Sequence, residues 1–171
     1  VGKDGNIGYP LVSVYLTGKE IRTIAEVDAS ISDFMTTARL YYSGVSTEFN
    51  PKRMILNKTV DVWRTPAICE DSDEELDDDK LYRIVTDSYS MSMLGAVTDL
   101  SKGILSVVPK DENGNPIKDP YDSIIYDENG NELKAWVALV EYLQSFESNE
   151  EGISEIPAYY NEYHNRKVVN D

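Results

Sequence analysis

The sequence predicts an α+β fold, a mixed β-sheet with helices packed on it, and three stretches support that prediction. Residues 10–46 have the pattern of a strand, a helical region and a second strand, residues 47–63 have that of a hairpin, and residues 132–146 that of an amphipathic helix. A length of 171 residues favours one domain of ordinary size. We therefore expect residues 1–8 to be a linker and residues 9–171 to form a single domain.

The first stretch begins with apolar and β-branched residues at 11–16, which predict a buried strand. Thr17 and Glu20 have the spacing of a capping box, which predicts that a helix begins directly after the strand. Ser30 is a second helix-start signal, and residues 40–45 return to strand composition. The apolar face of the second helix would consist of Ile31, Phe34, Met35 and Ala38.

The predicted hairpin has a turn signal at Asn50–Pro51 and strand composition over residues 54–63. It carries the densest basic group of the chain, which we interpret as solvated strand faces because exposed lysines protect edge strands against pairing. This group consists of Lys52, Arg53, Lys58 and Arg64.

Further along the chain, residues 81–86 predict a short strand and residues 87–100 a helix capped by Asp87 or Ser88. Strand composition resumes at residues 103–108. The helix at 132–146 has a wide apolar stripe, which we expect to lie on the sheet as part of the core. The stripe consists of Leu133, Trp136, Val137, Val140 and Leu143, and a short helix or extended cover is expected after Ser148.

Two kinds of acidic segment leave alternatives open. Residues 69–80 carry too much like charge to be buried and predict a mobile solvated loop, with a weak divalent-cation site as the alternative. The sequence Asp-Glu-Asn-Gly-Asn occurs at 111–115 and at 127–131. Asn-Gly pairs favour tight hairpin turns, whereas the alternative of a calcium loop requires glycine where Pro116 and Glu132 stand.

Charge and composition exclude several classes of function. The formal charge of −15 repels nucleic-acid phosphates and disfavours anionic membranes, so we expect no nucleic-acid partner. No apolar run approaches the roughly 20 residues of a transmembrane helix. Cys69 is the only cysteine, which excludes an internal disulfide and a cysteine-rich zinc site.

The inventory of catalytic residue types is poor, whereas tyrosine is abundant. The only histidine, His164, lies in a polar segment, and the chain has no P-loop, G-x-G-x-x-G or G-x-S-x-G motif. Among the 12 tyrosines, Tyr41, Tyr42 and Tyr89 lie near predicted strand ends, where a ring could stack on a ligand. The alternative is tyrosine in β-structure with its hydroxyl at the surface. By residue inventory, the chain is a binding or packing module rather than a complete catalyst.

Five stretches resemble, in order and spacing, the C-terminal domain of bacterial 5′-nucleotidases, a family that includes UDP-sugar hydrolases and 2′,3′-cyclic-nucleotide phosphodiesterases. The resemblance extends from about residue 8 to about residue 146 and is closest to secreted or surface-attached proteins of Gram-positive anaerobes, which implies an extracellular or cell-surface location. The stretches are GYPLVSVYLTGKE, LYYSGVSTEFNP, YRIVTDSYSMSMLG, LSVVPKDENGNPI and ELKAWVALVEYLQSF.

The resemblance implies a division of labour with a domain that this chain does not contain. In the family, an N-terminal metallophosphoesterase domain carries two divalent metal ions and the catalytic His-Asp pair, and the C-terminal domain binds the nucleotide or nucleotide sugar. This chain resembles only the second part. It would therefore contain no catalytic residue and no metal ligand, and the isolated chain would be inactive.

The resemblance also implies site residues, because the family stacks the base between two aromatic rings. One ring aligns with Tyr89, and the other aligns near Arg39, which takes the position of the aromatic residue, with Tyr41 and Tyr42 just beyond. The G-G-D-G-Y stretch of the family is replaced by S-M-L-G-A, in which Gly95 remains and the ribose-binding aspartate has no counterpart. The nucleotide preference is therefore expected to be different or looser. The alternative is a non-catalytic surface module that binds sugar or protein.

Overall fold

The computed structural model describes residues 4–36, 39–65, 73–100 and 105–170, and it confirms the predicted α+β class with mixed strands and helices. The chain divides into two compact units. The first unit consists of Val1–Tyr15, Arg83–Ala96 and Pro109–Tyr163, and the second of Leu16–Tyr82, Val97–Val108 and His164–Asp171. The boundaries expected for a linker and a single domain stay a prediction.

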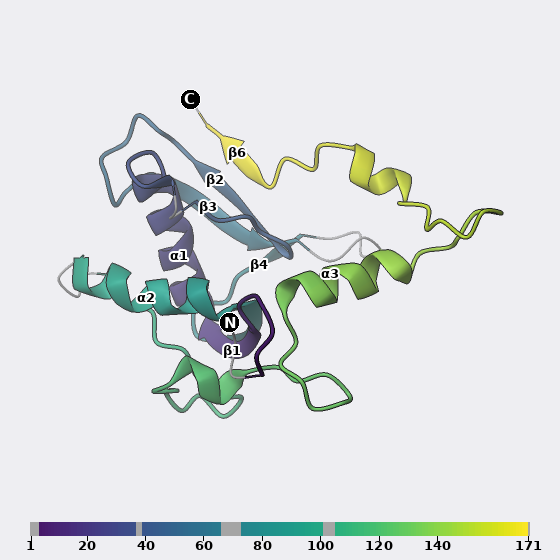
Figure 1. Cartoon of the computed structure of the whole chain (residues 1–171). Helices are drawn as coiled ribbons and strands as arrows, with labels where there is room; N and C mark the ends of the chain where they lie inside the picture. The colour runs from purple at the N-terminus through teal and green to yellow at the C-terminus, as the bar shows by residue number, and fades with distance from the viewer. Residues whose placement is uncertain (1–3, 37–38, 66–72, 101–104, 171) are drawn as a thin grey trace. The chain divides into compact units, whose positions relative to one another are not determined.

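The elements follow one another along the chain as shown in Figure 1. They are β1 (Leu11–Thr17), α1 (Gly18–Ile31), β2 (Val45–Phe49), β3 (Thr59–Arg64), β4 (Glu74–Glu75), β5 (Leu81–Asp87), α2 (Ser88–Leu100), the 3-10 helix η2 (Pro120–Ser123), α3 (Ala135–Gln144), the 3-10 helix η3 (Ala158–Asn161) and β6 (Lys167–Val169). Strands β1 and β5 form a two-stranded sheet, and the other four strands form a sheet with the order β4-β3-β2-β6.

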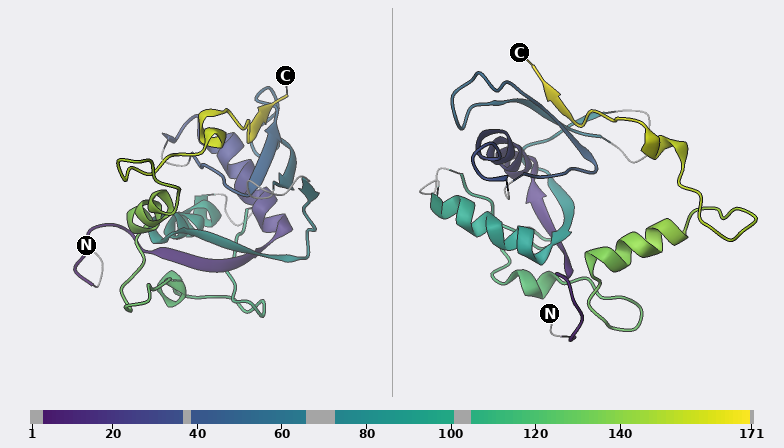
Figure 2. Two further views of the ribbon diagram at one scale, coloured as in Figure 1. Left: turned by 90° about the vertical axis from the view of Figure 1, so that its right-hand side faces the viewer. Right: turned by 45° about the horizontal axis from the view of Figure 1, so that its top comes forward.

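In the second unit, α1 packs against β3 of the four-stranded sheet, and the left view of Figure 2 shows the helix beside β2 and β3. The predicted capping box is present: the Thr17 amide donates to Glu20 Oε2, and the Glu20 amide donates to Thr17 Oγ1. Ile21 and Ala25 of this helix are buried. The sheet is mixed, because β2 pairs antiparallel with β3 and parallel with β6.

The start of α1 is closed by the acidic turn at residues 77–80. The Gly18 amide donates to the Lys80 carbonyl and the Lys19 amide to the Asp78 carbonyl, both at 3.2 Å. These bonds satisfy two of the amide groups that a helix leaves open at its N-terminus. A Cβ atom on Gly18 would lie 2.2 Å from the carbonyl oxygen of Asp77, so only glycine fits this close approach.

We therefore expect Gly18→Ala to lower the free energy of unfolding by about 2–3 kcal/mol, because the added methyl group must displace backbone atoms. Urea unfolding followed by circular dichroism measures the change. Lys19→Ala is the matched control, since Lys19 is exposed and is the next residue of the same helix. Equal unfolding midpoints for the two variants would contradict the steric account.

Arg22 joins α1 to two other parts of the second unit. Its guanidinium donates to the carboxylates of Asp61 and Asp78 and to the carbonyls of Val62 and Leu76, over distances of 3.0–3.2 Å. A planar guanidinium can satisfy several acceptors at once, which a lysine ammonium cannot do with the same geometry. Arg22 thus fixes β3 and residues 76–78 to the helix.

The second helix predicted from Ser30 is wrong. Helix α1 continues through Ser30 to Ile31, and the Ser30 hydroxyl donates to Glu26 within the same helix instead of capping a new one. Phe34 and Met35, predicted as a buried helical face, are exposed. Of the residues predicted for that face, Ala38 lies outside the described residues.

The predicted strand at residues 40–45 is also wrong, because β2 begins only at Val45. The Leu40 amide donates to the Asp28 carboxylate and is therefore not available to pair with a neighbouring strand. The hairpin itself is confirmed as the β2–β3 pair, but its connection spans residues 50–58, so β3 begins later than predicted.

The core of the first unit consists of Val12 and Val14 of β1 together with Met91 of α2. Strand β5 and helix α2 are confirmed, and Asp87 caps α2 by accepting a bond from the Ser90 amide at 2.9 Å. Four partly buried side chains complete this core: Ile84, Leu94, Ile117 and Ile124. The strand predicted at 103–108 is absent from residues 105–108, and its first two residues lie outside the described ranges.

The two Asp-Glu-Asn-Gly-Asn copies form tight turns in the first unit. Asp111 Oδ1 accepts from the amides of Asn113 and Asn115, and Asp127 makes the same bonds in the second copy. Hydrogen bonds from Asn115 lower the pKa of the Asp111 carboxyl, and the bond from the Asn115 side chain has a larger effect than the one from its backbone. A third turn of this design starts at Asn149. The sequence did not reveal it, because asparagine there replaces aspartate.

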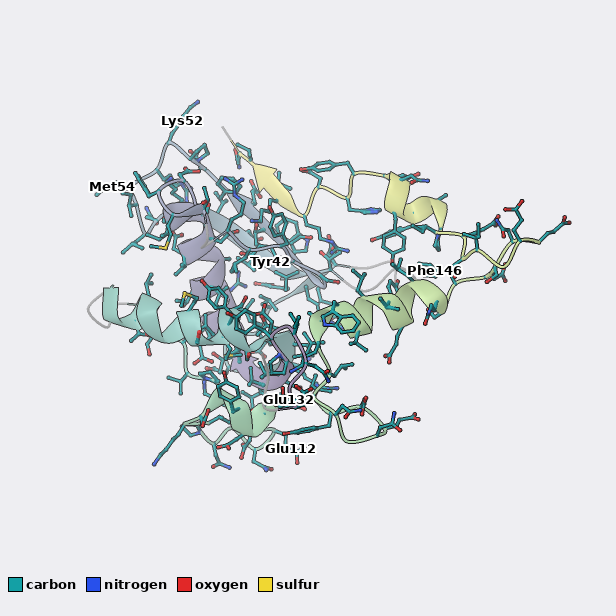
Figure 3. The ribbon with its side chains drawn as sticks, in the orientation of Figure 1. Tyr42, Lys52, Met54, Glu112, Glu132 and Phe146 are labelled. Carbon is teal, nitrogen blue, oxygen red and sulfur yellow. The ribbon has the colours of Figure 1, made fainter. Side chains whose placement is uncertain are left out.

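Helix α3 is not the buried core helix that its periodicity predicts, since none of its residues is buried. It begins at Ala135, and its apolar side chains contact other segments of the first unit. Trp136 Nε1 donates to the Ile7 carbonyl at 3.0 Å, and the Tyr142 ring packs edge-on against Phe146, which Figure 3 labels at the end of the helix. The short helix expected in the tail is confirmed as η3, whereas β6 was not predicted.

Candidate functional site

The candidate site in the second unit is built around Asp28, a buried carboxylate in the last turn of α1. Asp28 Oδ1 accepts from the Leu40 amide at 3.0 Å, and Oδ2 accepts from the Tyr42 hydroxyl at 3.0 Å. Lys167 Nζ of β6 forms an ion pair with the same Oδ2 at 2.5 Å. Asp28 therefore connects a helix, the segment before β2 and a C-terminal strand, and Figure 3 labels Tyr42 within this group.

Tyr41 is the exposed ring of this group, with 89% of its surface accessible. Asp28 accepts from the amide of Leu40 before it and from the side-chain hydroxyl of Tyr42 after it, which restrains the segment that carries the ring. Lys167 Nζ lies 5.9 Å from the centroid of the Tyr41 ring. An exposed aromatic ring on a fixed backbone suits stacking on a planar ligand.

Tyr42 has a different environment, since its ring is partly buried and its hydroxyl is bonded to Asp28. Burial, the negative charge of Asp28 and this hydrogen bond together raise the pKa of the Tyr42 hydroxyl far above its usual range. The hydroxyl therefore stays a neutral donor and holds the segment in place. Arg39, two residues before Tyr41 in the sequence, is exposed. Its amide donates to the Thr36 carbonyl at 3.2 Å.

Tyr89 belongs to the first unit, where it lies in the first turn of α2. Its partly exposed ring pairs with the ring of Tyr9, with centroids 5.3 Å apart and an interplanar angle of 37°. The Ser88 amide donates to the Pro10 carbonyl at 2.9 Å, which holds the two tyrosine-bearing segments together. Tyr9 was missed by the sequence reasoning, although its place directly before β1 is a signal.

The structure thus groups Tyr41 with Tyr42 in the second unit and pairs Tyr89 with Tyr9 in the first. Gly95, the fifth candidate residue, lies in α2. The ligand-binding roles of these five candidates stay predictions.

Within the part of the chain that the structure describes, no group of three or more His, Cys, Asp or Glu side chains could hold a metal ion. His164 is exposed, and Cys69 lies outside that part. None of the helices in the described ranges combines the length and the apolar character needed to cross a bilayer.

A sequence profile of the family described as "5′-nucleotidase, C-terminal domain" matches residues 6–99. The chain belongs to this family. The match covers more than half of the chain and includes all five candidate site residues. The resemblance seen in the sequence is thereby confirmed for this domain.

Two solved structures are similar to this 5′-nucleotidase C-terminal domain. A 5′-nucleotidase precursor from Thermus thermophilus matches 95% of this chain with 20% sequence identity and a TM-score of 0.54, and the match covers 25% of that protein. NAD nucleotidase from Haemophilus influenzae matches 57% of this chain with 24% identity and a TM-score of 0.43, covering 18% of that protein. The first similarity supports the fold. No curated protein matches the sequence.

Proposed function

We propose that this 5′-nucleotidase C-terminal domain is the substrate-specificity domain of a metal-dependent phosphohydrolase that acts on nucleotides or nucleotide sugars. The observation that carries the proposal is the family match, because it contains every residue proposed to contact the substrate. An N-terminal metallophosphoesterase domain with two divalent metal ions would break the phosphoester bond. The isolated domain would bind the substrate without cleaving it, and the parent enzyme would be secreted or attached to the cell surface.

The proposed role of this domain is to stack the base and to leave the phosphate to its partner domain. Tyr41 would supply a stacking face in the second unit, and the Tyr9–Tyr89 pair is a separate candidate aromatic surface in the first unit. Arg39 would add a cation beside Tyr41, and Tyr42 would hold the segment. The formal charge of −15 supports this division, since such a charge opposes capture of phosphate by the domain alone.

The proposal is tested by titrating the 171-residue chain with AMP, UMP, UDP-glucose and adenosine, with binding followed by NMR chemical shifts. We expect saturable binding of at least one of them, with an affinity on the order of millimolar for an isolated half-site. Tyr41→Ala or Tyr89→Ala should weaken binding about tenfold or more, because each base-aromatic stack contributes on the order of 1–3 kcal/mol.

Tyr163→Ala is the matched control for Tyr41→Ala, because its ring is 85% exposed and lies outside the family match. This control should bind like the unchanged chain. Metal-dependent hydrolysis of AMP by the purified chain would contradict the proposal.

A second candidate function is a surface module that binds sugar or protein. It is favoured by the S-M-L-G-A stretch, which lacks the aspartate expected to bind a ribose. Absence of binding by all four ligands at high concentration, with the chain folded, would favour this second function.

A further inference from the structure

The connection between β2 and β3 exposes three consecutive large apolar side chains. Met54 is 80% accessible and Ile55 is 55% accessible, and Leu56 follows them as a third exposed residue. Figure 3 shows Lys52 and Met54 at the outer edge of this connection. Isolated exposed apolar residues are ordinary, but a run of three at the end of a hairpin requires an explanation.

The backbone of this connection is held by hydrogen bonds to side chains of α1. The Leu56 amide donates to the buried Ser30 hydroxyl at 2.8 Å, and Leu56 has a φ of 64°. The Glu26 carboxylate accepts from the amides of Lys58 and Thr59 at 3.0 and 2.7 Å. The connection is therefore a defined loop anchored on α1, and its three apolar side chains are exposed.

A second exposed apolar pair lies beside this loop. Phe34 is 75% accessible and Met35 is also exposed, and both follow directly on Asp33. The Asp33 carboxylate lies 3.5 Å from Lys58 Nζ, so the two segments are neighbours in the second unit. We call these five exposed side chains, taken together, the tip patch: Phe34, Met35, Met54, Ile55 and Leu56.

The charge around the tip patch is opposite in sign to that of the whole chain. Residues 30–35 and 50–58 contain three cations and one anion, whereas the chain has a formal charge of −15. Asp33 is paired with Lys58, and Glu26, whose carboxylate accepts from the amides of Lys58 and Thr59, is a second anion beside the loop, which leaves three cations against two anions. Lys52 and Arg53 are exposed directly before Met54. The patch therefore combines apolar side chains with positive charge.

We propose that the tip patch is a contact site for an anionic lipid bilayer. Its apolar side chains would enter the boundary between headgroups and acyl chains, and Lys52 and Arg53 would lie among the lipid phosphates. A stable protein interface usually needs about 20–30 residues on each side, far more than this tip offers. The net negative charge of the whole chain repels an anionic bilayer, but at roughly 0.15 M salt this repulsion is screened beyond about 8 Å.

The test is flotation of the purified chain with vesicles of phosphatidylcholine alone or mixed with phosphatidylglycerol, at roughly 0.15 M salt. We expect reversible binding that is stronger to the mixed vesicles. The double variant Met54→Ser with Ile55→Ser should bind about tenfold less, because its apolar insertion is lost. Arg53→Gln should reduce the preference for phosphatidylglycerol.

A matched control is the double variant Ile153→Ser with Ile156→Ser, whose side chains are 59% and 56% exposed in the first unit among acidic neighbours. It should bind like the unchanged chain. Circular dichroism should show that both double variants remain folded, since all four positions are exposed. Absence of vesicle binding, or equal losses in both double variants, would overturn the proposal. Dimer formation without vesicles, abolished by the Met54 and Ile55 changes, would instead identify a second copy as the occupant.

Discussion

Replacing Lys134 by methionine is expected to lower the free energy of unfolding by about 3–5 kcal/mol, because it leaves a buried carboxylate without its cation. The Lys134 side chain is 1% exposed and pairs with Glu132, whose side chain is 5% exposed, and with Asp4 at 3.2 Å. Methionine has a similar shape, so the lost charge pairing dominates over lost packing. Urea unfolding measures the difference from the unchanged chain.

The pH dependence gives this prediction a second readout. Burial alone lowers the pKa of Lys134, but the hydrogen bonds and charges of Glu132 and Asp4 outweigh it, so the pKa is raised. The stabilisation that the charged Lys134 provides is then complete below the pKa of lysine in the unfolded chain, about 10.4. It is lost as the pH rises through the higher pKa that Lys134 has in the folded chain. We expect the Lys134→Met variant not to show this loss of stability at alkaline pH.

Two further variants distinguish the contribution of the Lys134 ion pairs from a general effect of removing a lysine on stability. Lys118→Met, at an exposed position, should leave stability unchanged. Adding Glu132→Leu to Lys134→Met should restore part of the loss, because it removes the unpaired charge of Glu132, the more buried of the two partners, whereas Asp4 stays. A Lys134→Met variant as stable as Lys118→Met would show that the pairing of Lys134 with Glu132 and Asp4 contributes nothing to stability.

The features that could be predicted from the sequence follow local rules. The capping box of Thr17 and Glu20, the strand before it and the cap at Asp87 depend on residues a few positions apart, and all are present. The periodicity of apolar residues also predicted helix α3, but it did not predict that none of the residues of this helix is buried. Periodicity reports which residues share a face, whereas burial depends on which segments cover that face.

The candidate site was less predictable, because its supports are distant in sequence. Tyr41 and Tyr89 were identified from a family resemblance, but no local pattern indicates that Asp28 pairs with Lys167. The same limitation explains the strand wrongly predicted at residues 40–45. Its composition favours a strand, but the Leu40 amide donates to Asp28 instead of to a neighbouring strand.

Replacing Asp28 by alanine is expected to lower the free energy of unfolding by about 3–4 kcal/mol, because three partners lose their acceptor at once. The Leu40 amide, the Tyr42 hydroxyl and the Lys167 ammonium would be left without it. Asp28→Asn should cost less, since an amide oxygen can still accept one of these bonds. Urea unfolding of the two variants measures this order.

The consequence for the proposed function is specific, because Asp28 holds the Leu40 amide and the Tyr42 side chain, the residues on either side of Tyr41. If a fixed ring is needed for stacking, Asp28→Asn should weaken nucleotide binding although Tyr41 itself is unchanged. Lys167→Met tests the charge pairing separately, and combining it with Asp28→Asn should cost less than the sum of the single changes. Strictly additive losses would show that the pair is not coupled. Unaltered nucleotide affinity in a folded Asp28→Asn variant would show that Tyr41 needs no fixed support.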